Sequence, residues 1–400
     1  MAAGTAADWR SLDLFAPSPE HALLAETLRE FVKREVEPQA AAHDRGECFN
    51  HALFRRAGEL GLLGVTLPEE YGGAGLDAVA AVQVCESLST ADPGFALSVL
   101  AHSILFAQNL SVNGNDLQKK SLLPGAATGA LIGGLCMTEP EVGTDVLALR
   151  TRARRDGDEY VIDGTKTFIT NGGVDDRTLG DAFIVYARTE DSKVSAFLVE
   201  KGAPGFRLGQ KWKDKLGMRA SFTAELVFDG VRVPVTGRLG QEGEGARHMM
   251  RNLEIERLTL AAMSVGIAQR CVEVMIGHAN QRKSFGQPLR EHGQIQRYVA
   301  ESFAEYRAAR TFVYDVARRM DLHATGQRVD ADAAKLFAAQ AGKRAADAAI
   351  QVLGGYGYMG EYVVERLWRD AKLLEIGGGT LEAHHKNLMK DLSRDPTRVR

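Results

Sequence analysis

The strongest constraint on the fold is a change of hydrophobic period along the 400-residue chain. Up to about residue 130, and again from about 241 to 400, apolar residues recur at helical spacing in runs with few breakers. Between about 131 and 240 the runs are short, rich in Val, Ile, Phe and Tyr, and separated by Asp-Gly turns. Helices, strands and helices therefore follow one another. This order lacks the alternation of a doubly wound parallel sheet.

The pattern predicts an α+β protein of three domains. Residues 1–130 form an N-terminal helical domain, residues 131–240 a β-barrel or sandwich, and residues 241–400 a C-terminal helical bundle. The first helix is expected to end before Pro38. The long helices of the bundle are expected over 246–280, 294–322 and 330–352.

Composition excludes several classes of protein. Lys and Arg number 49 against 52 Asp and Glu, a net charge of −3, which argues against a nucleic-acid binder. The most apolar window, 96–110, is interrupted by polar residues and is shorter than the ~18 residues of a membrane span. No secretory signal is recognised. We therefore expect no nucleic acid and no membrane span.

The cysteines point to a reducing compartment. Cys48, Cys85, Cys136 and Cys271 are far apart, and their spacing fits neither a disulfide framework nor a zinc site. We expect no metal and a location in the bacterial cytoplasm, or in the mitochondrial matrix if the source is eukaryotic. The pair His384-His385 is interpreted as solvated, because adjacent residues on a helix face different directions.

Two segments carry the most specific chemistry. The first is LCMTEPEVGTD at 135–145, and the second is GTKTFITNG at 164–172. A Pro- and Gly-containing loop of this kind can turn its backbone N–H groups toward a ligand. The segment GYGYMG at 355–360 matches a dinucleotide fingerprint, but a helix end rather than a strand precedes it. We therefore reject that interpretation.

Both segments resemble the signatures of the acyl-CoA dehydrogenase family of flavoenzymes. Further matches in family order are KLGMR at 215–219, RKSFG at 282–286, QVLGG at 351–355 and RDAK at 369–372. The resemblance implies a helical domain, a β-barrel and a four-helix bundle, with FAD between barrel and bundle. It also implies an acyl-CoA substrate, electron-transfer flavoprotein as the electron acceptor, and a homotetramer.

The resemblance assigns residues to the two ligands. Those implied to bind FAD are Leu135, Met137, Thr138, Gly143, Thr144, Phe168, Ile169, Thr170, Arg282, Phe285, Gln351, Leu353, Gly354, Gly355, Thr380 and Glu382. Those implied to bind the acyl thioester are Thr144, Glu254, Arg257, Gly378 and Gly379. One departure is His292-Gly293, where the family usually has Phe-Gln; this chain therefore lacks an amide that contacts FAD in other members, and Gln294 could replace it.

A base is needed to remove the α-proton of the thioester, and the residues offer a candidate. Many family members carry this base in a loop before the last helix, where this chain has Gly378. Glu256 is the one charge on an apolar helical stripe that includes Leu253 and Leu260. Such a carboxylate needs a tertiary partner or a function, and spacing alone leaves both open.

The family decides between these alternatives. In the isovaleryl-CoA dehydrogenase branch the base lies on this helix within an E-R-L motif, with a small residue at the loop position. Glu256-Arg257-Leu258 together with Gly378 resembles that arrangement. The resemblance thus implies Glu256 as general base and the backbone N–H of Gly378 as a donor to the thioester carbonyl.

The predicted function is FAD-dependent α,β-dehydrogenation of a short branched acyl-CoA such as isovaleryl-CoA. Three alternatives remain open. They are a dehydrogenase for longer or carrier-bound acyl groups, an O₂-using oxidase or monooxygenase of the same fold, and a non-catalytic nucleic-acid-associated member.

Overall fold

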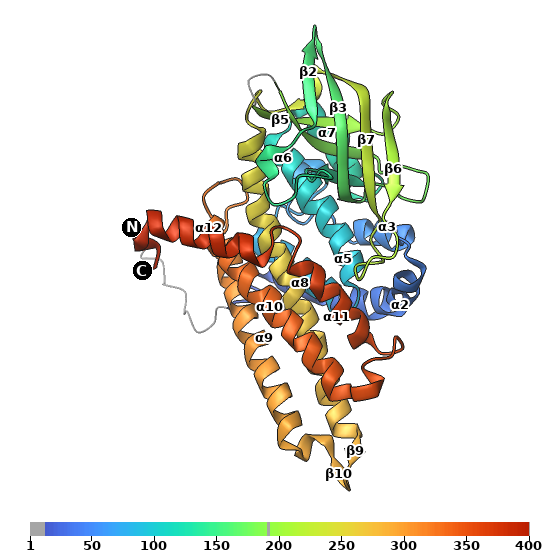
Figure 1. The fold of residues 1–400 in the computed structure, drawn as a ribbon, viewed down its shortest axis with the longest axis vertical. Helices are drawn as coiled ribbons and strands as arrows, with labels where there is room; N and C mark the ends of the chain where they lie inside the picture. Colours follow the sequence, from blue (N-terminus) through green and yellow to red (C-terminus); the bar gives the residue numbers. More distant parts are fainter. Residues whose placement is uncertain (1–12, 190–192, 400) are drawn as a thin grey trace.

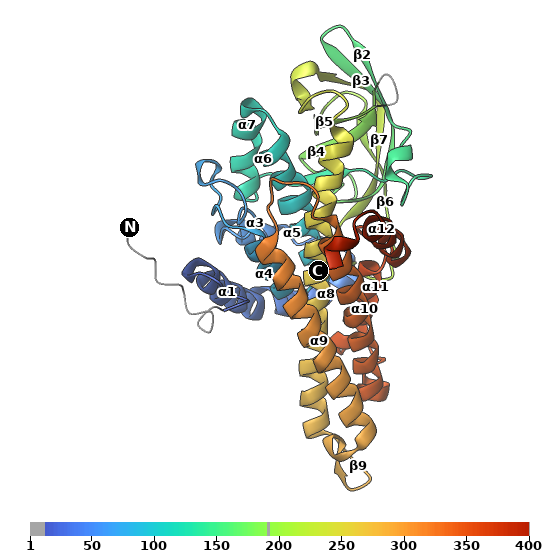
Figure 2. The same ribbon diagram turned by 90° about the vertical axis from the view of Figure 1, so that its left-hand side faces the viewer.

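A computed structural model describes residues 13–189 and 193–399. The sheet lies at one end of the molecule, and the C-terminal helices extend away from it toward the opposite end (Figures 1 and 2). The N-terminal helices pack where the two meet. The predicted order of helices, strands and helices is confirmed.

The N-terminal part is helical, but Pro38 does not end its first helix as predicted. A π-helical turn over Val32–Val36 joins α1 to α2. Proline then lies in the first turn of α2, where its missing N–H is not needed. The helices of this part are α1 (Pro19–Phe31), α2 (Glu37–Gly46), α3 (His51–Glu59), α4 (Ala78–Ser89), α5 (Pro93–Leu100), α6 (Asn109–Asn113) and α7 (Asp116–Ala127).

A π-helical segment, Ala101–Gln108, joins α5 to α6 into one apolar helix. This helix, Pro93–Asn113, and α8 (Gly245–Gln281) are long and apolar enough to cross a membrane by length and composition. Of their most apolar windows, 83% and 67% are buried inside the protein. Both helices therefore serve as core helices of this fold.

The middle part is one eight-stranded sheet in the order β6-β7-β3-β2-β4-β5-β8, with β1 parallel to β4. The long strands β3 and β7 pair antiparallel, and their register shifts between Lys166 and Ile169. The strands are β1 (Gly133–Cys136), β2 (Arg152–Asp156), β3 (Glu159–Thr170), β4 (Ala182–Arg188), β5 (Val194–Glu200), β6 (Phe206–Lys211), β7 (Thr223–Pro234) and β8 (Arg238–Leu239).

The C-terminal part is a bundle in which α8 runs from the sheet to the far tip, where the hairpin of β9 (Lys283–Ser284) and β10 (Gln287–Pro288) lies (Figure 1). The helix α8 packs along α10, and both pack on α9. The remaining helices are α9 (Gly293–Arg319), α10 (Arg328–Leu353), α11 (Val363–Leu374) and α12 (Leu381–Arg394).

The loop that follows β6 ties the sheet to the bundle. A Cβ atom on Gly217 would lie 2.5 Å from the carbonyl carbon and oxygen of Arg369 on α11. The next residue, Met218, donates its backbone N–H to Asp370 at 2.5 Å. The KLGMR and RDAK segments therefore meet at one interdomain contact, and the close approach of the two backbones requires glycine.

Candidate active site

A buried ion pair joins the two segments that carry the most specific chemistry. Lys166 on β3 donates to Glu139 at 2.8 Å and to the carbonyl of Met137 at 3.1 Å. Both charged side chains are almost fully buried. The Glu139 carboxylate also accepts the backbone N–H groups of Arg150 and Thr151. The loop after β1 is thereby fixed against β3.

The register shift in β3 turns an aromatic side chain outward. Phe168 has φ +58°, which is uncommon outside glycine, and its side chain is 62% exposed. Its ring lies 5.2 Å from that of Trp212, whose indole donates to the hydroxyl of Thr167 at 3.1 Å. The backbone N–H of Thr167 donates to the carbonyl of Thr138 at 2.9 Å. A flat apolar surface thus stands beside the loop that contains Thr138.

The residues after Phe168 link β3 to the N-terminal helices. The side chain of Asn171 donates to the carbonyls of Ser98 at 2.9 Å and Gly133 at 3.2 Å. Asn171 also has φ +61°. Ile169 is buried, whereas Thr170 is half-buried, and within the described part of the chain its hydroxyl has no protein partner. The hydroxyl of Thr170 is therefore available to a ligand.

Glu256 lies on α8 and is only 9% exposed. Its Oε2 atom is buried and has no hydrogen-bond partner among the described residues. Burial raises the pKa of Glu256 from 4.5 to about 7, although the charges of Arg257 and Lys335 act to lower it. A carboxylate with this pKa can take and release a proton near neutral pH.

Gly378 faces this carboxylate. A Cβ atom built on Gly378 would lie 3.7 Å from Oε1 of Glu256 and 2.5 Å from Cδ1 of Leu260. The φ of Gly378 is +66°, which favours glycine. The structure thus places Gly378 directly opposite Glu256, the residue predicted to be the base.

Two cations hold the loop that contains Gly378. Arg257 donates to the Gly378 carbonyl at 3.0 Å, and Lys335 on α10 donates to the Gly379 carbonyl at 2.7 Å. Within residues 13–189 and 193–399, the backbone N–H groups of Gly378 and Gly379 have no protein acceptor. These two donors are therefore free to meet a carbonyl oxygen.

The last helix begins directly after this loop. The Thr380 side chain caps α12 by accepting the N–H of Ala383 at 3.2 Å, and Glu382 is exposed in the first turn. His385 is exposed as expected, but the interpretation of His384 as solvated is wrong. His384 is fully buried and lies 3.0 Å from Asp332, because its side of α12 packs on α10.

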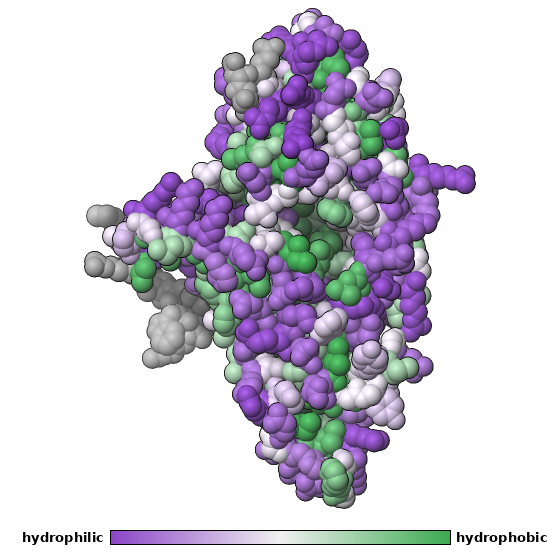
Figure 3. All heavy atoms as spheres, in the orientation of Figure 1, coloured by the Kyte–Doolittle hydropathy of each residue, from purple (hydrophilic) through white to green (hydrophobic). Residues whose placement is uncertain are grey.

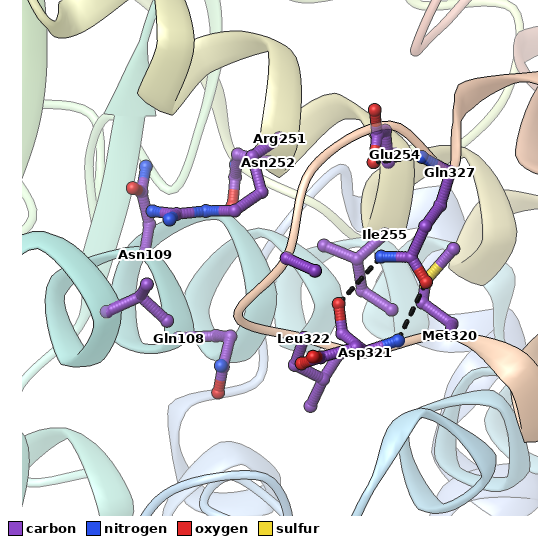
Figure 4. A pocket seen from close by; sticks show the side chains of 12 residues that line it. Gln108, Asn109, Arg251, Asn252, Glu254, Ile255, Met320, Asp321, Leu322 and Gln327 are labelled. Atoms are coloured by element: carbon purple, nitrogen blue, oxygen red, sulfur yellow. Dashed lines mark hydrogen bonds between the residues drawn. The ribbon is translucent and has the colours of Figure 1, made fainter.

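Glu254 points away from Glu256. Its carboxylate accepts the backbone N–H groups of Gly326 at 3.1 Å and Gln327 at 3.0 Å. Burial raises its pKa. The side chain lies beside a small cavity of about 10 Å³ between α6, α8 and the 320–327 loop (Figure 4), which has room for about one water molecule. In this conformation Glu254 holds the loop, and its role toward a substrate stays a prediction.

The remaining candidate cofactor residues lie at the tip of the bundle. The guanidinium of Arg282 lies 5.9 Å from the ring centroid of Tyr356, and Phe285 is 96% exposed with φ +51°. At 1.5 Å per residue, the 26 residues of helix from Glu256 to Arg282 span about 39 Å. Arg282 is therefore far from Glu256 of its own chain. The tip group comprises Arg282, Phe285, Gln351, Leu353, Gly354 and Gly355.

The space-filling view shows an apolar hollow where the sheet meets the bundle (Figure 3). Three large apolar side chains from the segments of this junction are exposed, namely Phe168, Leu216 and Ile376. An exposed apolar surface with a few convergent backbone donors is typical of a cofactor site. Of the other residues assigned to it, Gly143 and Thr144 are exposed and Leu135 is half-buried.

Comparison with known proteins assigns the chain to a family. Models of the acyl-CoA dehydrogenase N-terminal, middle and C-terminal domains match residues 18–130, 134–231 and 243–393. The chain belongs to the acyl-CoA dehydrogenase family. Mitochondrial isovaleryl-CoA dehydrogenase of Oryza sativa subsp. japonica is 39% identical over 376 residues, which are 92% of this chain and 90% of that protein.

Solved structures of family members share the whole fold. Butyryl-CoA dehydrogenase from Megasphaera elsdenii has a TM-score of 0.89 at 32% identity, covering 96% of this chain and 99% of that one. A glutaryl-CoA dehydrogenase from Mycobacterium smegmatis in complex with FADH2 has a TM-score of 0.89 at 30% identity, covering 94% and 95%. The expected family and fold are confirmed.

Two charged residues that support this site, Asp332 and Lys335, were not predicted from the sequence. Asp332 and Lys335 occur at helical spacing on the alanine-rich, buried face of α10. Two charges on such a face are a signal comparable to that of Glu256 on α8. Glu139 and Lys166 belong to the two motifs, but the sequence does not show that one binds the other.

Proposed function

We propose that this member of the acyl-CoA dehydrogenase family oxidises a short branched acyl-CoA, such as isovaleryl-CoA, to the 2-enoyl-CoA. The observation that carries the proposal is the buried Glu256 carboxylate facing Gly378. The cofactor is FAD, which the hollow, the exposed Phe168 ring and the free Thr170 hydroxyl suit. When bound, FAD accepts the hydride that leaves the β-carbon.

The residues of this chain supply the acid–base part of the reaction. Glu256 takes the α-proton of the thioester onto its carboxylate, which poor solvation makes basic enough near pH 7. The free N–H of Gly378 donates to the thioester carbonyl and stabilises the negative charge that develops there. Burial keeps water from the carboxylate during this step.

The proposed substrate class rests on the position of the base. Glu256 reaches the site from α8, and glycine occupies the loop position opposite. Removing a side chain from the loop leaves room beside the acyl group, which suits a branched chain. The Oryza sativa relative, which acts on isovaleryl-CoA by its name, supports the same choice.

The proposal is tested by anaerobic titration of the purified holoenzyme with isovaleryl-CoA, followed through the visible flavin band. We expect the band to bleach with the wild type. Glu256→Gln should retain FAD but lose turnover by ~100-fold or more. Glu273→Gln, an exposed carboxylate on the same helix, is the matched control and should behave like the wild type.

Near-normal turnover in Glu256→Gln would contradict the assignment of the base. If the flavin band does not bleach with isovaleryl-CoA but bleaches with longer or carrier-bound thioesters, the substrate belongs to one of those classes. Rapid peroxide formation in air would favour the oxidase alternative over transfer to electron-transfer flavoprotein, which we propose as the electron acceptor.

We also propose a homotetramer. Arg282 lies about 39 Å along α8 from Glu256, so a second copy of the chain would be needed to bring it to the same FAD. Light scattering on the purified protein would measure the mass of the oligomer.

We also propose that residues 1–130, 131–240 and 241–400 form the three domains. A location in the bacterial cytoplasm or mitochondrial matrix fits the relatives, which include a mitochondrial and a Bacillus subtilis protein.

A further inference from the structure

The loop opposite the proposed base is held by two buried cations from two different helices. Arg257 on α8 binds the carbonyl of Gly378, and Lys335 on α10 binds the carbonyl of the next residue, Gly379. In a trans peptide the C=O and the following N–H point in opposite directions. These two bonds therefore set the directions of the N–H groups of Gly379 and Thr380 and fix the backbone that follows Gly378.

The two cations differ in how their charge is balanced. Arg257 forms an ion pair with Asp332 at 2.7 Å. Asp332 also lies 3.0 Å from the ring of His384 and accepts a hydrogen bond from Asn387 at 3.0 Å. Arg257 is thus part of a buried polar cluster in which the Asp332 carboxylate balances its charge.

Lys335 has no such partner. Its side chain is fully buried, and within the described part of the chain no carboxylate lies within 4 Å of its ammonium. A buried ammonium without a counter-charge is costly. Burial lowers its pKa to about 8, and the charge of Glu256 is the strongest influence that raises it again.

The other charged and titratable groups around the pair come from several elements. They are Arg257 on α8, Asp332 on α10, Glu375 at the end of α11, His384 on α12 and Tyr186 on β4. Arg257 and Lys335 are the cations that act on Glu256. Arg257 has the larger effect and is itself bound to Asp332, whereas Lys335, which has no ion-pair partner among the described residues, supplies the second positive charge that acts on the base.

We propose that Lys335 is a positioning residue for the proposed active site, which holds the Gly378–Gly379 loop through its hydrogen bond and serves as the counter-charge of the Glu256 carboxylate. The inference rests on the proposed function only for the role of Glu256 as the base. The two roles can be separated by mutation. Holding the loop needs a hydrogen-bond donor, whereas acting as the counter-charge of Glu256 needs a positive charge.

The experiment compares Lys335→Gln with Lys335→Met in the holoenzyme. Glutamine retains a donor for the Gly379 carbonyl but removes the charge, whereas methionine removes both. Lys343→Met is the matched control, because Lys343 lies two turns further along the same helix and stacks on Trp368 at 3.9 Å. The readouts are the pH profile of kcat/KM for isovaleryl-CoA, FAD content and the thermal unfolding midpoint.

Without the positive charge, the ionised form of Glu256 is less favoured. The acid limb of the pH profile should move to higher pH by about one unit in both Lys335 variants. In Lys335→Met, kcat/KM at its optimum should also fall by about tenfold or more, because the loop carbonyl has lost its donor. Lys343→Met should leave the profile unchanged.

Profiles that match the wild type in both Lys335 variants would overturn the inference. A lower FAD content or a lower unfolding temperature in the variants, with the acid limb at the same pH as in the wild type, would also overturn it. That outcome is expected if Lys335 has a purely structural role. If Lys335→Met does not fold, Lys335→Gln still tests the counter-charge through its acid limb.

An infrared pH titration separates failure of this inference from failure of the proposed function. The C=O stretch of a protonated buried carboxylic acid that is absent in Glu256→Gln reports Glu256 directly and needs no turnover. Its midpoint should be higher in Lys335→Gln than in the wild type. A higher midpoint in a protein that does not oxidise acyl-CoA would contradict the function and support the inference, and an unchanged midpoint would overturn the inference.

Discussion

The pKa of Glu256 links the proposed chemistry to the stability of the fold. In the folded protein this pKa is about 7, against 4.5 for the free side chain. As the pH rises, the unfolded chain therefore releases this proton first. The folded state is destabilised as the pH increases from about 4.5 to about 7, and the penalty stays constant above that.

We expect Glu256→Gln to be more stable than the wild type above pH 7, with little difference below pH 4.5. One pKa unit corresponds to about 1.4 kcal/mol, so a shift from 4.5 to about 7 gives a gain of at most about 3.5 kcal/mol. Thermal unfolding of both proteins without substrate, at pH 4.5 and pH 8, measures it. If the difference in stability between the two proteins does not increase with pH, the Glu256 carboxylate does not have a raised pKa in the folded protein.

How far a residue could be predicted from the sequence depended on where its partners lie. The unusual environment of Glu256 could be predicted because its own helix shows that it is the one charge on an apolar face, whereas its role as the base was implied only by the family resemblance. The burial of Lys335 could be predicted in the same way from the alanine-rich face of α10, but that of His384 could not, because it depends on how α12 packs on α10. The long helices were predicted within a few residues, whereas the π-helical turn before Pro38 was not, because proline there fits a helix start as well as a helix end.

At the scale of an element, a buried ion pair holds β3 beside its register shift. Glu139 and Lys166 connect the loop after β1 to β3 just before the outward-facing Phe168. Removing one member of a buried pair leaves the other charge uncompensated, which costs about 3–5 kcal/mol. The pair therefore holds the surface on which we place the flavin.

Glu139→Gln should lower the thermal unfolding midpoint and reduce the FAD retained after gel filtration. Combining it with Lys166→Met should recover part of the loss, since the unpaired ammonium is then absent. Glu141→Gln is the control in the same loop, because its partner Arg150 is exposed and surface pairs contribute about 0–1 kcal/mol. Equal effects of the two Glu→Gln changes would contradict the role of the buried pair.

At the scale of the whole molecule, the sheet and the bundle must keep a fixed distance for Phe168 and Glu256 to serve one ligand. The contact of Gly217 and Met218 with α11 maintains this distance. Lys215 supports it from inside the loop by donating to the carbonyls of Met218 at 2.9 Å and Ser221 at 2.7 Å. Burial lowers the pKa of Lys215 to about 8, against the charge of Asp370.

Gly217→Ala tests whether this contact positions the two domains. Its Cβ atom would meet the backbone of Arg369 at 2.5 Å, and overpacking of this kind costs about 1–3 kcal/mol. We expect a lower unfolding midpoint and weaker FAD retention, since the loop must move away from α11. Gly277→Ala is the control: this glycine lies within α8 with open space around its Cβ position, so alanine should stabilise the helix by about 0.5–1 kcal/mol. If Gly217→Ala binds FAD as tightly as the control and unfolds at the same temperature, the distance between sheet and bundle does not depend on this contact.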